Sequence, residues 1–245
     1  MAIIPARYES KRFPGKVLAD LCGKPVIQHV YEKVTLSKSI TGIYIATDDD
    51  RIREAVTGFG GNVIMTSPDH ESGTDRVAEA AKFVCCGDII VNVQGDEPLI
   101  EPSLIDAVVD KIANDREVVC TTAAIPISDE TVYHDPNTVK VVLDRKGRAL
   151  YFSRSPLPYW RDESDVKRAY AHVGIYCFRR NFLDIFTSLE PTLLEKAEKL
   201  EQLRMLEHGY RIGIVLTDSV SKGIDTKEDL EAARKYFVLQ HKIEV

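Results

Sequence analysis

The sequence predicts an α/β fold that combines a mostly parallel, mixed sheet with a hairpin-bearing insertion. In the first half, short apolar segments alternate with segments whose apolar residues recur at helical spacing, which is typical of a parallel sheet. After residue 130 two strand patterns flank a charged turn with a glycine, which indicates a β-hairpin. No internal repeat or long linker occurs. We therefore expect one domain over residues 1–245, with a core of 1–130 and 190–245 and an insertion at about 131–189.

The elements of the first half follow from apolar runs and helix-end signals. Apolar runs predict strands at 2–5, 42–47, 88–94 and 117–127. Helices are expected from Pro25, a favoured first-turn residue, and at about 49–58, 74–84 and 102–113. Gly58, Gly60 and Gly61 are suited to end the second of these helices with a left-handed cap.

The second half is predicted in the same way. Leucines and an alanine recur at helical spacing from Leu193 to Leu206, and Gly209 is a suitable C-cap, so one helix is expected over 193–208. The other expected elements are hairpin strands at 138–143 and 149–153, strands at 169–178 and 210–217, a short helix near 181–188 and a final helix at about 227–240.

Composition limits the function. A hydrophobic content of 44% with 29% charged residues is ordinary for a globular protein, and no apolar run approaches the roughly 20 residues of a membrane helix. The net charge of −6 argues against nucleic acid as a partner. No signal peptide is apparent. The cysteines are odd in number and lack C-x-x-C spacing, so we expect buried thiols in a reducing cytoplasm: Cys22, Cys85, Cys86, Cys120 and Cys177.

A cation-rich loop follows the first strand. Its basic residues are Arg7, Lys11, Arg12 and Lys16. Such a loop at the carboxyl edge of a parallel sheet can surround anionic oxygens with fixed charges and backbone N–H groups. Neither a Walker A motif nor G-x-G-x-x-G occurs, which argues against P-loop ATPases and dinucleotide dehydrogenases. The loop is interpreted either as a polyphosphate site or as a solvated basic loop.

Two aspartates are candidate ligands of a hard cation. Asp96 stands just past a buried strand, between Gly95 and a following turn, and Asp225 precedes the last helix. Carboxylates in such positions bind Mg²⁺ together with water and phosphate oxygens. Alternatively, Asp96 is a turn residue and Asp225 is a helix N-cap.

Other polar segments also allow two interpretations. Ser72-Gly73-Thr74-Asp75-Arg76 opens a helix and contains capping residues, but Gly73 also permits close approach of a ligand and Arg76 adds a fixed charge. Asp48-Asp49-Asp50 resembles the D-x-D metal motif of glycosyltransferases, and we interpret it instead as the acidic first turn of a helix.

The chain resembles the sugar-acid cytidylyltransferases, and most closely those that act on 3-deoxy-D-manno-octulosonate (Kdo). The resemblance begins in Ile3-Ile4-Pro5-Ala6-Arg7-Tyr8-Glu9-Ser10 and continues to Phe13-Pro14-Gly15-Lys16. Further matching blocks occur in the family's order over nearly the whole chain: 23–25, 46–49, 70–76, Gln94-Gly95-Asp96-Glu97-Pro98, 150–156, 172–176, Leu200-Glu201-Gln202-Leu203-Arg204 and 223–226.

The resemblance implies a Rossmann-like nucleotidyltransferase fold of the nucleotide-diphospho-sugar transferase type and transfer of CMP from CTP to Kdo. It implies a Mg²⁺ cofactor held by Asp96 and Asp225, with Arg7, Lys16, Asp96 and Asp225 as the catalytic residues. It places Ala6, Arg7, Arg12, Lys16, Ser72, Gly73, Thr74, Arg76 and Gln94 at the nucleotide. It places Gln94, Arg154, His172, Tyr176, Glu201 and Gln202 at the sugar acid.

The resemblance further implies a cytoplasmic homodimer that supplies lipopolysaccharide synthesis, with no nucleic-acid partner and no membrane insertion. Alternatives remain for the second half, since His172 is also typical of a structural histidine and Glu201 and Gln202 of helix surfaces. Alternative functions are a sialic-acid cytidylyltransferase, a metal-dependent glycosyltransferase and a non-catalytic nucleotide-binding module.

Overall fold

The structure is a computed structural model that describes the chain except for residues 11, 85–86, 163–167, 220–222 and 244–245. Lys11, Cys85 and Cys86 therefore lie outside the described residues. The chain forms two compact units, Met1–Ile105 with Val220–Val245, and Asp106–Ser219. Helix α4 (Pro102–Asn114) begins in the first unit and continues into the second. The expectation of a single domain stays a prediction.

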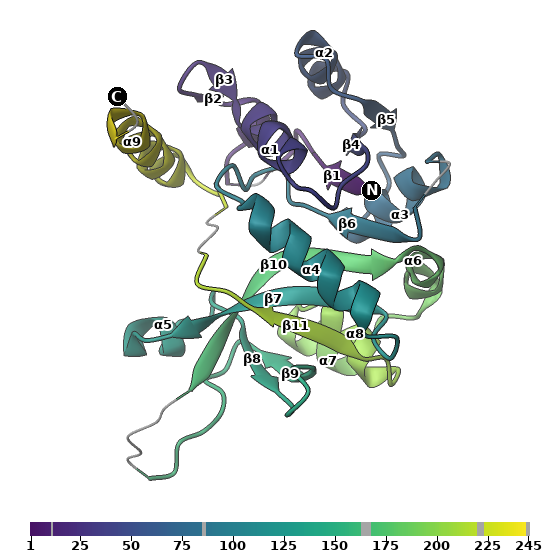
Figure 1. The fold of residues 1–245 in the computed structure, drawn as a ribbon, viewed down its shortest axis with the longest axis vertical. Coiled ribbons are helices and arrows are strands. Elements are labelled where there is room, and N and C mark those ends of the chain that lie inside the picture. The colour runs from purple at the N-terminus through teal and green to yellow at the C-terminus, as the bar shows by residue number, and fades with distance from the viewer. Residues whose placement is uncertain (11, 85–86, 163–167, 220–222, 244–245) are drawn as a thin grey trace. The chain divides into compact units, whose positions relative to one another are not determined.

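The first unit contains an all-parallel set of strands in the order β6 (Ile89–Asn92), β1 (Ala2–Pro5), β4 (Ile43–Thr47) and β5 (Val63–Met65) (Figure 1). Its other elements are α1 (Val26–Thr35), α2 (Asp50–Gly58), α3 (Gly73–Lys82), α9 (Lys227–Ile243), the 3-10 turn η1 (Lys16–Leu18) and the small hairpin of β2 (Asp20–Leu21) and β3 (Lys24–Pro25).

The order of these strands explains where a ligand can bind. The chain runs from β1 outward to β4 and β5, and then crosses back to β6 on the other side of β1. The loops that follow β1 and β6 therefore diverge, and such a switch point at the carboxyl ends of parallel strands is where open α/β sheets bind ligands. All of β1 is buried, as its apolar sequence predicts for a central parallel strand.

A small apolar cluster attaches the C-terminal segment to the first unit. Ile224 is fully buried and packs in one cluster with Leu21, Val26, Leu230 and Ala233. The N–H of Ile224 also donates to the carbonyl of Asp96 at 2.9 Å. Because Asp225 is the next residue, this packing brings its side chain to the end of β6.

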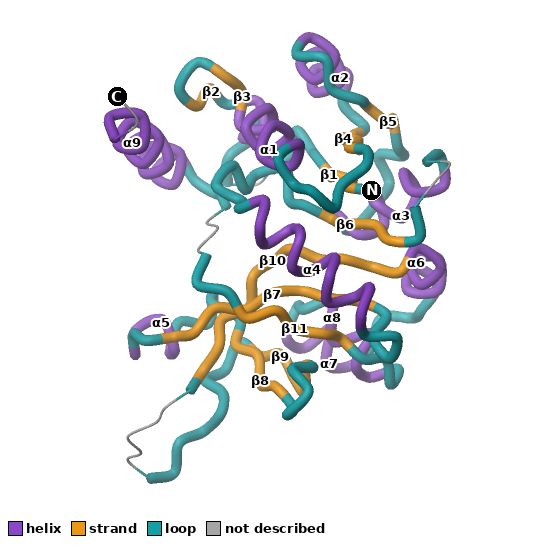
Figure 2. Tube along the Cα trace, viewed as in Figure 1, coloured by secondary structure: helices purple, strands orange, loops and turns teal. Residues whose placement is uncertain are grey.

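The second unit is a mixed sheet with short helices (Figure 2). Strand β11 (Ile212–Leu216) is parallel to β7 (Cys120–Ile127), whereas β10 (Ala169–Arg179) is antiparallel to β7. The expected hairpin is confirmed as β8 (Lys140–Leu143) and β9 (Ala149–Ser153), and β8 also pairs with β10. The helices are α5 (Glu130–His134), α6 (Arg180–Ser188), α7 (Leu193–Glu198) and α8 (Gln202–Glu207).

Several expectations about elements were wrong or incomplete. The single helix expected over 193–208 is two helices, because Lys199 has a left-handed backbone (φ 55°) that ends α7. Its apolar series is not one buried stripe, since Leu193 is 77% exposed while Leu203 is buried. The strands β2, β3 and β5 and the helix α5 are too short to give a periodic pattern.

The cysteine expectation was partly wrong. Cys120 and Cys177 are buried thiols, as expected, but Cys22 is exposed in the turn between β2 and β3.

The mostly parallel α/β class is confirmed. Within the described ranges, the structure has no helix of the length and apolarity that crossing a membrane requires.

Candidate active site

A cavity of about 280 Å³ lies in the first unit where β1 and β6 end. Its lining includes five residues that the resemblance assigns to the site: Arg7, Lys16, Gly73, Gln94 and Asp96. A second cavity of about 810 Å³ shares Arg7, Glu9 and Ser10 with the first and extends to Asp48 and Asp49. The two cavities thus adjoin along the cation-rich loop.

Two glycines shape the backbone at and beside the first cavity. Gly95 lies so close to β1 that an added Cβ would stand 2.9 Å from the carbonyl oxygen of Pro5 and 3.0 Å from the Cδ1 of Ile27. Gly15 has a left-handed backbone (φ 71°), and its N–H donates to the carbonyl of Tyr8 at 2.7 Å. The loop therefore closes on itself, and Lys16 begins η1 directly after this turn.

Lys16 is the centre of a charge cluster. Its ammonium donates to the carboxylates of Asp96 and of Asp225, the latter at 2.9 Å. Arg12 forms a further ion pair with Asp225 at 2.8 Å. Burial acts to lower the pKa of Lys16, but the two carboxylates outweigh it and raise that pKa above its usual value. Lys16 is therefore a fixed cation between two anions.

Asp225 does not act as the N-cap of the last helix. That role belongs to the next residue, because the hydroxyl of Thr226 accepts from the N–H of Asp229 at 3.1 Å and the carboxylate of Asp229 accepts from the N–H of Thr226 at 3.0 Å. The carboxylate of Asp225 is consequently available to the charge cluster. Its alternative interpretation as a cap was wrong.

Arg7 is held by main-chain oxygens. Its guanidinium donates to the carbonyl of Ser72 at 3.1 Å, to that of Glu71 at 3.4 Å and also to that of His70. Glu79 braces the same loop, since its carboxylate contacts the His70 ring and accepts from the N–H of Ser67 at 2.9 Å. The sequence contained no local signal for this support of Arg7.

Ser72 and Arg76 combine structural and ligand-related features. Ser72 caps α3 in a capping box with Asp75, so its capping interpretation is confirmed. Arg76 is fully buried and contacts Thr66 at 2.5 Å and Asp48 at 3.1 Å. Burial and the nearby charge of Arg7 lower its pKa, against the opposite effect of Asp48. Within the described residues, its Nε and Nη2 have no hydrogen-bond partner, which is costly unless a ligand or water accepts from them.

The remaining first-unit candidates lie around these groups. Ala6 is buried directly after β1, and Thr74 is buried in the first turn of α3. Gln94 lines the cavity and its amide donates to Asn92 at 3.3 Å. Asp49 caps α2 by accepting from the N–H of Arg51, and Asp50 lies in the first turn, which confirms the expected acidic helix start.

His172 and Tyr176 lie together in the second unit, on β10. Their ring centroids are 5.4 Å apart, and the Nε2 of His172 is 2.9 Å from the hydroxyl oxygen of Thr122. Burial lowers the pKa of His172 to about 4, so the ring is neutral at pH 7. Burial, and then the charge of Glu201, raise the pKa of Tyr176, whose hydroxyl therefore stays protonated.

Arg154 follows β9 and is held from several sides. Its Nε donates to the carbonyl of Glu198 at 2.8 Å and its Nη1 to that of Pro136 at 3.0 Å. Glu201 and Gln202 begin α8 after the turn at Lys199, and Gln202 is 4% exposed. The five second-unit candidates are thus Arg154, His172, Tyr176, Glu201 and Gln202, whereas Gln94 belongs to the first unit.

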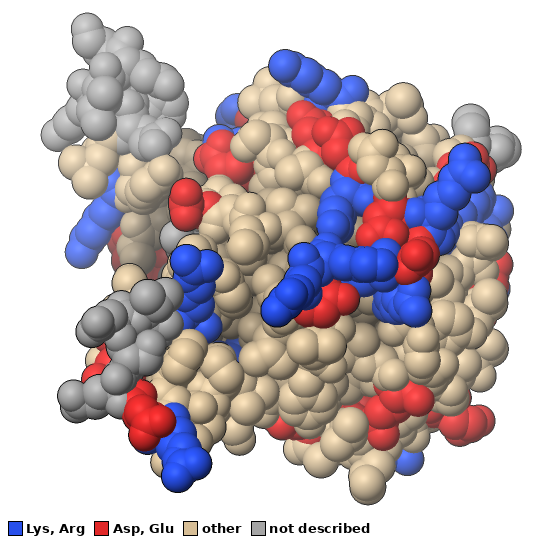
Figure 3. Space-filling view, turned by 60° about the horizontal axis from the view of Figure 1, so that its bottom comes forward, with Lys and Arg blue, Asp and Glu red and all other residues tan. Residues whose placement is uncertain are grey.

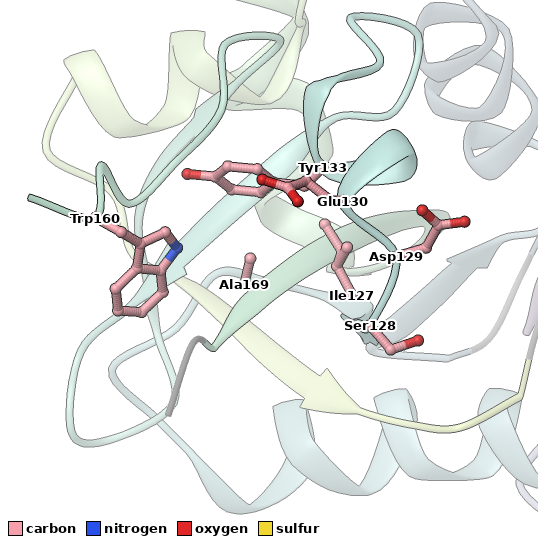
Figure 4. A pocket seen from close by; sticks show the side chains of 7 residues that line it. All are labelled: Ile127, Ser128, Asp129, Glu130, Tyr133, Trp160 and Ala169. Carbon is pink, nitrogen blue, oxygen red and sulfur yellow. The ribbon is translucent and has the colours of Figure 1, made fainter. Parts of the chain in front are cut away.

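A separate cavity of about 210 Å³ in the second unit is lined by none of the predicted residues (Figure 4). Trp160 and Tyr133 face this cavity, and the hydroxyl of Tyr133 donates to the carbonyl of Pro158 at 2.6 Å. Because the charge cluster and the switch point both lie in the first unit, we place the candidate active site there.

The donor set fits a small hard cation. Asp96 and Asp225 converge on one ammonium, and carboxylate oxygens with phosphate and water are the ligands that Mg²⁺ prefers. The described residues contain no cluster of three or more His, Cys, Asp or Glu side chains that could bind a metal without such additional oxygens. On the face in Figure 3, basic side chains stand beside acidic ones, as they do in this cluster.

Comparisons with known proteins identify the family. The model of the cytidylyltransferase family matches residues 1–212. The 3-deoxy-manno-octulosonate cytidylyltransferase of Geobacter sulfurreducens is 53% identical over 240 residues, which cover 94% of this chain and 96% of the relative. The enzyme of that name from Geotalea uraniireducens is also 53% identical, with 94% and 95% covered.

Among solved structures, that of CMP:2-keto-3-deoxy-manno-octonic acid synthetase complexed with CTP is similar, with a TM-score of 0.94, 42% identity and 98% of each chain covered. The similarity thus extends over both units rather than over the N-terminal loop alone. The chain therefore belongs to the cytidylyltransferase family and, within it, to the group of the 3-deoxy-manno-octulosonate cytidylyltransferases.

Proposed function

We propose that the chain transfers CMP from CTP to the anomeric hydroxyl of Kdo, which gives CMP-Kdo and pyrophosphate. The observation that carries this function is the cluster of Lys16, Asp96 and Asp225 beside Arg7 at the switch point of the sheet. The family to which the chain belongs supports CTP as the nucleotide and Kdo as the acceptor.

The reaction needs no nucleophile from the protein. The anomeric hydroxyl of Kdo gives up its proton to water, its oxygen attacks the α-phosphorus of CTP, the bond from that phosphorus to the bridging oxygen breaks, and pyrophosphate leaves. The protein then acts by positioning the two substrates and by neutralising phosphate charge. Arg7 and Lys16 bind the β- and γ-phosphates, and Arg12 lies nearby on Asp225. Ala6, Ser72, Gly73, Thr74 and Arg76 hold the nucleoside, and the two unsatisfied guanidinium nitrogens of Arg76 support a ligand-binding role.

Asp96 and Asp225 would hold Mg²⁺. When bound, this ion supplies Lewis-acid stabilisation of phosphate oxygens and lowers the pKa of the attacking hydroxyl. The two carboxylates by themselves attract cations to the end of β6. Lys16 bridges the two carboxylates and Arg12 pairs with Asp225, so two cations balance the two anions within the protein.

The second-unit residues bind the sugar acid, and Gln94, which the resemblance also assigns to it, lies in the first unit. Arg154 is suited to the substrate carboxylate because a guanidinium can form two parallel hydrogen bonds to it. Neutral His172, protonated Tyr176, Glu201 and Gln202 offer the donors and acceptors that several hydroxyls require.

We further propose a cytoplasmic homodimer whose product supplies lipopolysaccharide assembly. The use of CTP as a substrate supports the cytoplasmic location. Light scattering after gel filtration tests whether the protein is a dimer. A sialic-acid cytidylyltransferase is less well supported, because the relatives are named for 3-deoxy-manno-octulosonate.

Pyrophosphate release tests the function. The purified protein is incubated with Mg²⁺, Kdo and each of CTP, ATP, GTP and UTP, and then with CTP and sialic acid. We expect release with CTP and Kdo, and loss of release after EDTA. Preference for another nucleotide, equal use of sialic acid or activity that is unaffected by EDTA would contradict the proposal.

A further inference from the structure

Lys140 is a fully buried cation in the second unit. It begins β8 and pairs with Ser153 of β9. Its Nζ donates to the carbonyls of Asp135 at 2.9 Å, Thr138 at 2.6 Å and Arg154 at 2.6 Å. An ammonium has three N–H donors, so all of them are used on main-chain oxygens. Lys140 therefore acts on the protein itself and not on a bound substrate.

Glu198 holds the other side of the same peptide segment. Its carboxylate accepts from the N–H of Arg154 at 2.9 Å and from the hydroxyl of Ser153 at 2.6 Å. The main chain of Arg154 is thus fixed at its carbonyl by a cation and at its N–H by an anion. Hydrogen bonds to charged groups are stronger than those between neutral groups, so the main chain of Arg154 is held rigidly between Lys140 and Glu198.

Lys140 also fixes the loop that receives the Arg154 side chain. The guanidinium of Arg154 donates to the carbonyl of Pro136, which lies between the two other carbonyls held by Lys140. One buried ammonium therefore sets both the main chain of Arg154 and one of the acceptors that direct its guanidinium. The second acceptor is the main-chain carbonyl of Glu198.

Stability alone does not explain a charge in this place. Burial lowers the pKa of Lys140 and the charge of Arg154 adds to this, against the opposite effects of Asp135 and Glu198, so desolvation is the largest effect on the ammonium. The neighbouring Val141 is buried, and a buried apolar residue at position 140 would avoid the cost of a buried charge. The three main-chain carbonyls that Lys140 binds explain why a cation occupies this position.

We propose that Lys140 and Glu198 are positioning residues that orient Arg154 toward the carboxylate of the sugar acid. This inference rests on the proposed function, in which Arg154 binds that carboxylate. It adds two residues on the sugar-acid side, and both lie outside the blocks of the resemblance. Their only signal in the sequence is Lys140, a lysine within the apolar strand expected from Thr138 to Leu143.

The test compares Lys140→Met, Glu198→Gln, Arg154→Ala and the double variant Lys140→Met with Arg154→Ala. Lys146→Met is the matched control, because Lys146 is exposed in the turn of the same hairpin. For each variant, KM for Kdo, KM for CTP, kcat and Tm are measured. We expect Lys140→Met to raise KM for Kdo by about 10-fold, the effect of a lost hydrogen bond to a charged group, with KM for CTP unchanged.

The double variant separates positioning from a general structural role. If Lys140 acts through Arg154, removing it adds less than twofold to KM for Kdo once Arg154 is alanine. If Lys140→Met does not fold, Glu198→Gln tests the inference in its place. We expect the same rise in KM for Kdo from Glu198→Gln, and less than a twofold further rise when it is combined with Arg154→Ala.

Each failure has a distinct result. No pyrophosphate from the parental protein with CTP and Kdo overturns the proposed function, and an unchanged KM for Kdo in Arg154→Ala overturns the role of Arg154. The positioning inference alone is overturned if Arg154→Ala raises KM for Kdo while folded Lys140→Met and Glu198→Gln do not. It is also overturned if the effects of Lys140→Met and Arg154→Ala multiply, or if Lys146→Met gives the same rise.

Discussion

Lys16 and Asp225 lie 209 residues apart in the chain and form an ion pair of 2.9 Å. The same ammonium contacts Asp96, so three charges from distant parts of the chain meet beside one cavity. The pair depends on Ile224, whose buried side chain and hydrogen bond to Asp96 carry Asp225 to this place.

Removal of either carboxylate charge is expected to disable turnover. Asp96→Asn and Asp225→Asn each lower kcat by on the order of 10² or more, because each removes electrostatic stabilisation at the reacting centre. Tm changes little, since asparagine has nearly the size of aspartate and each variant leaves Lys16 paired with the other carboxylate. Steady-state pyrophosphate release and thermal unfolding are the measurements.

Asp50→Asn is the control for this pair. Asp50 is also a first-unit aspartate in an ion pair with an arginine, but its side chain is 69% exposed and it contacts Arg53 rather than Lys16. We expect parental kcat from it. Near-parental turnover of Asp96→Asn or Asp225→Asn at saturating Mg²⁺ would show that the aspartate concerned has only a structural role.

The two substrates are expected to respond to different residues. Arg7→Ala weakens binding of CTP, because it removes a cation at the phosphates. Gln202→Ala raises KM for Kdo, because unpairing a buried polar group costs about 1–3 kcal/mol. Calorimetric titration of CTP alone, without Kdo, gives the sharper comparison. Equal weakening of CTP binding by Gln202→Ala would refute this division and would assign α8 to the nucleotide or to stability.

His172 is expected to make stability depend on pH. Its folded pKa of about 4 lies below the unfolded value of 6.5, so between these values the unfolded state binds a proton that the folded state does not. Stability is therefore lost as the pH falls from 6.5 to 4 and is unaffected by this group above 6.5. His172→Gln removes this part of the decline, measured as Tm of both proteins from pH 4 to 7. If the Tm values of the two proteins fell in parallel from pH 7 to pH 4, this role of His172 would be refuted.

Gly95 is expected to tolerate no side chain. In Gly95→Ala the new Cβ stands 2.9 Å from the Pro5 carbonyl oxygen, so overpacking destabilises the fold by about 1–3 kcal/mol. Gly58→Ala is the matched control, since nothing lies within 4 Å of its Cβ position at the end of α2. Denaturant unfolding compares the two, and equal stability of both variants would contradict the expected close approach.

Much of the local structure could be predicted from the sequence, because it depends on neighbours along the chain. The strand at 2–5, the capping box of Ser72 and the charged turn of the hairpin are set by residues a few positions apart. The end of α7 at Lys199 was not predicted, because the apolar spacing continues through this residue. The leucines on its two sides nevertheless differ in exposure.

The α/β class, most elements and the candidate residues could be inferred from the sequence. Which of these residues meet depends on the folded chain: Asp225 pairs with Lys16 instead of capping α9, Arg7 is held by the 70–72 carbonyls, and the buried Lys140 donates to the carbonyl of Arg154. The physical reason is that these contacts join residues far apart in sequence. Their energies depend on burial and on partners that no local pattern encodes.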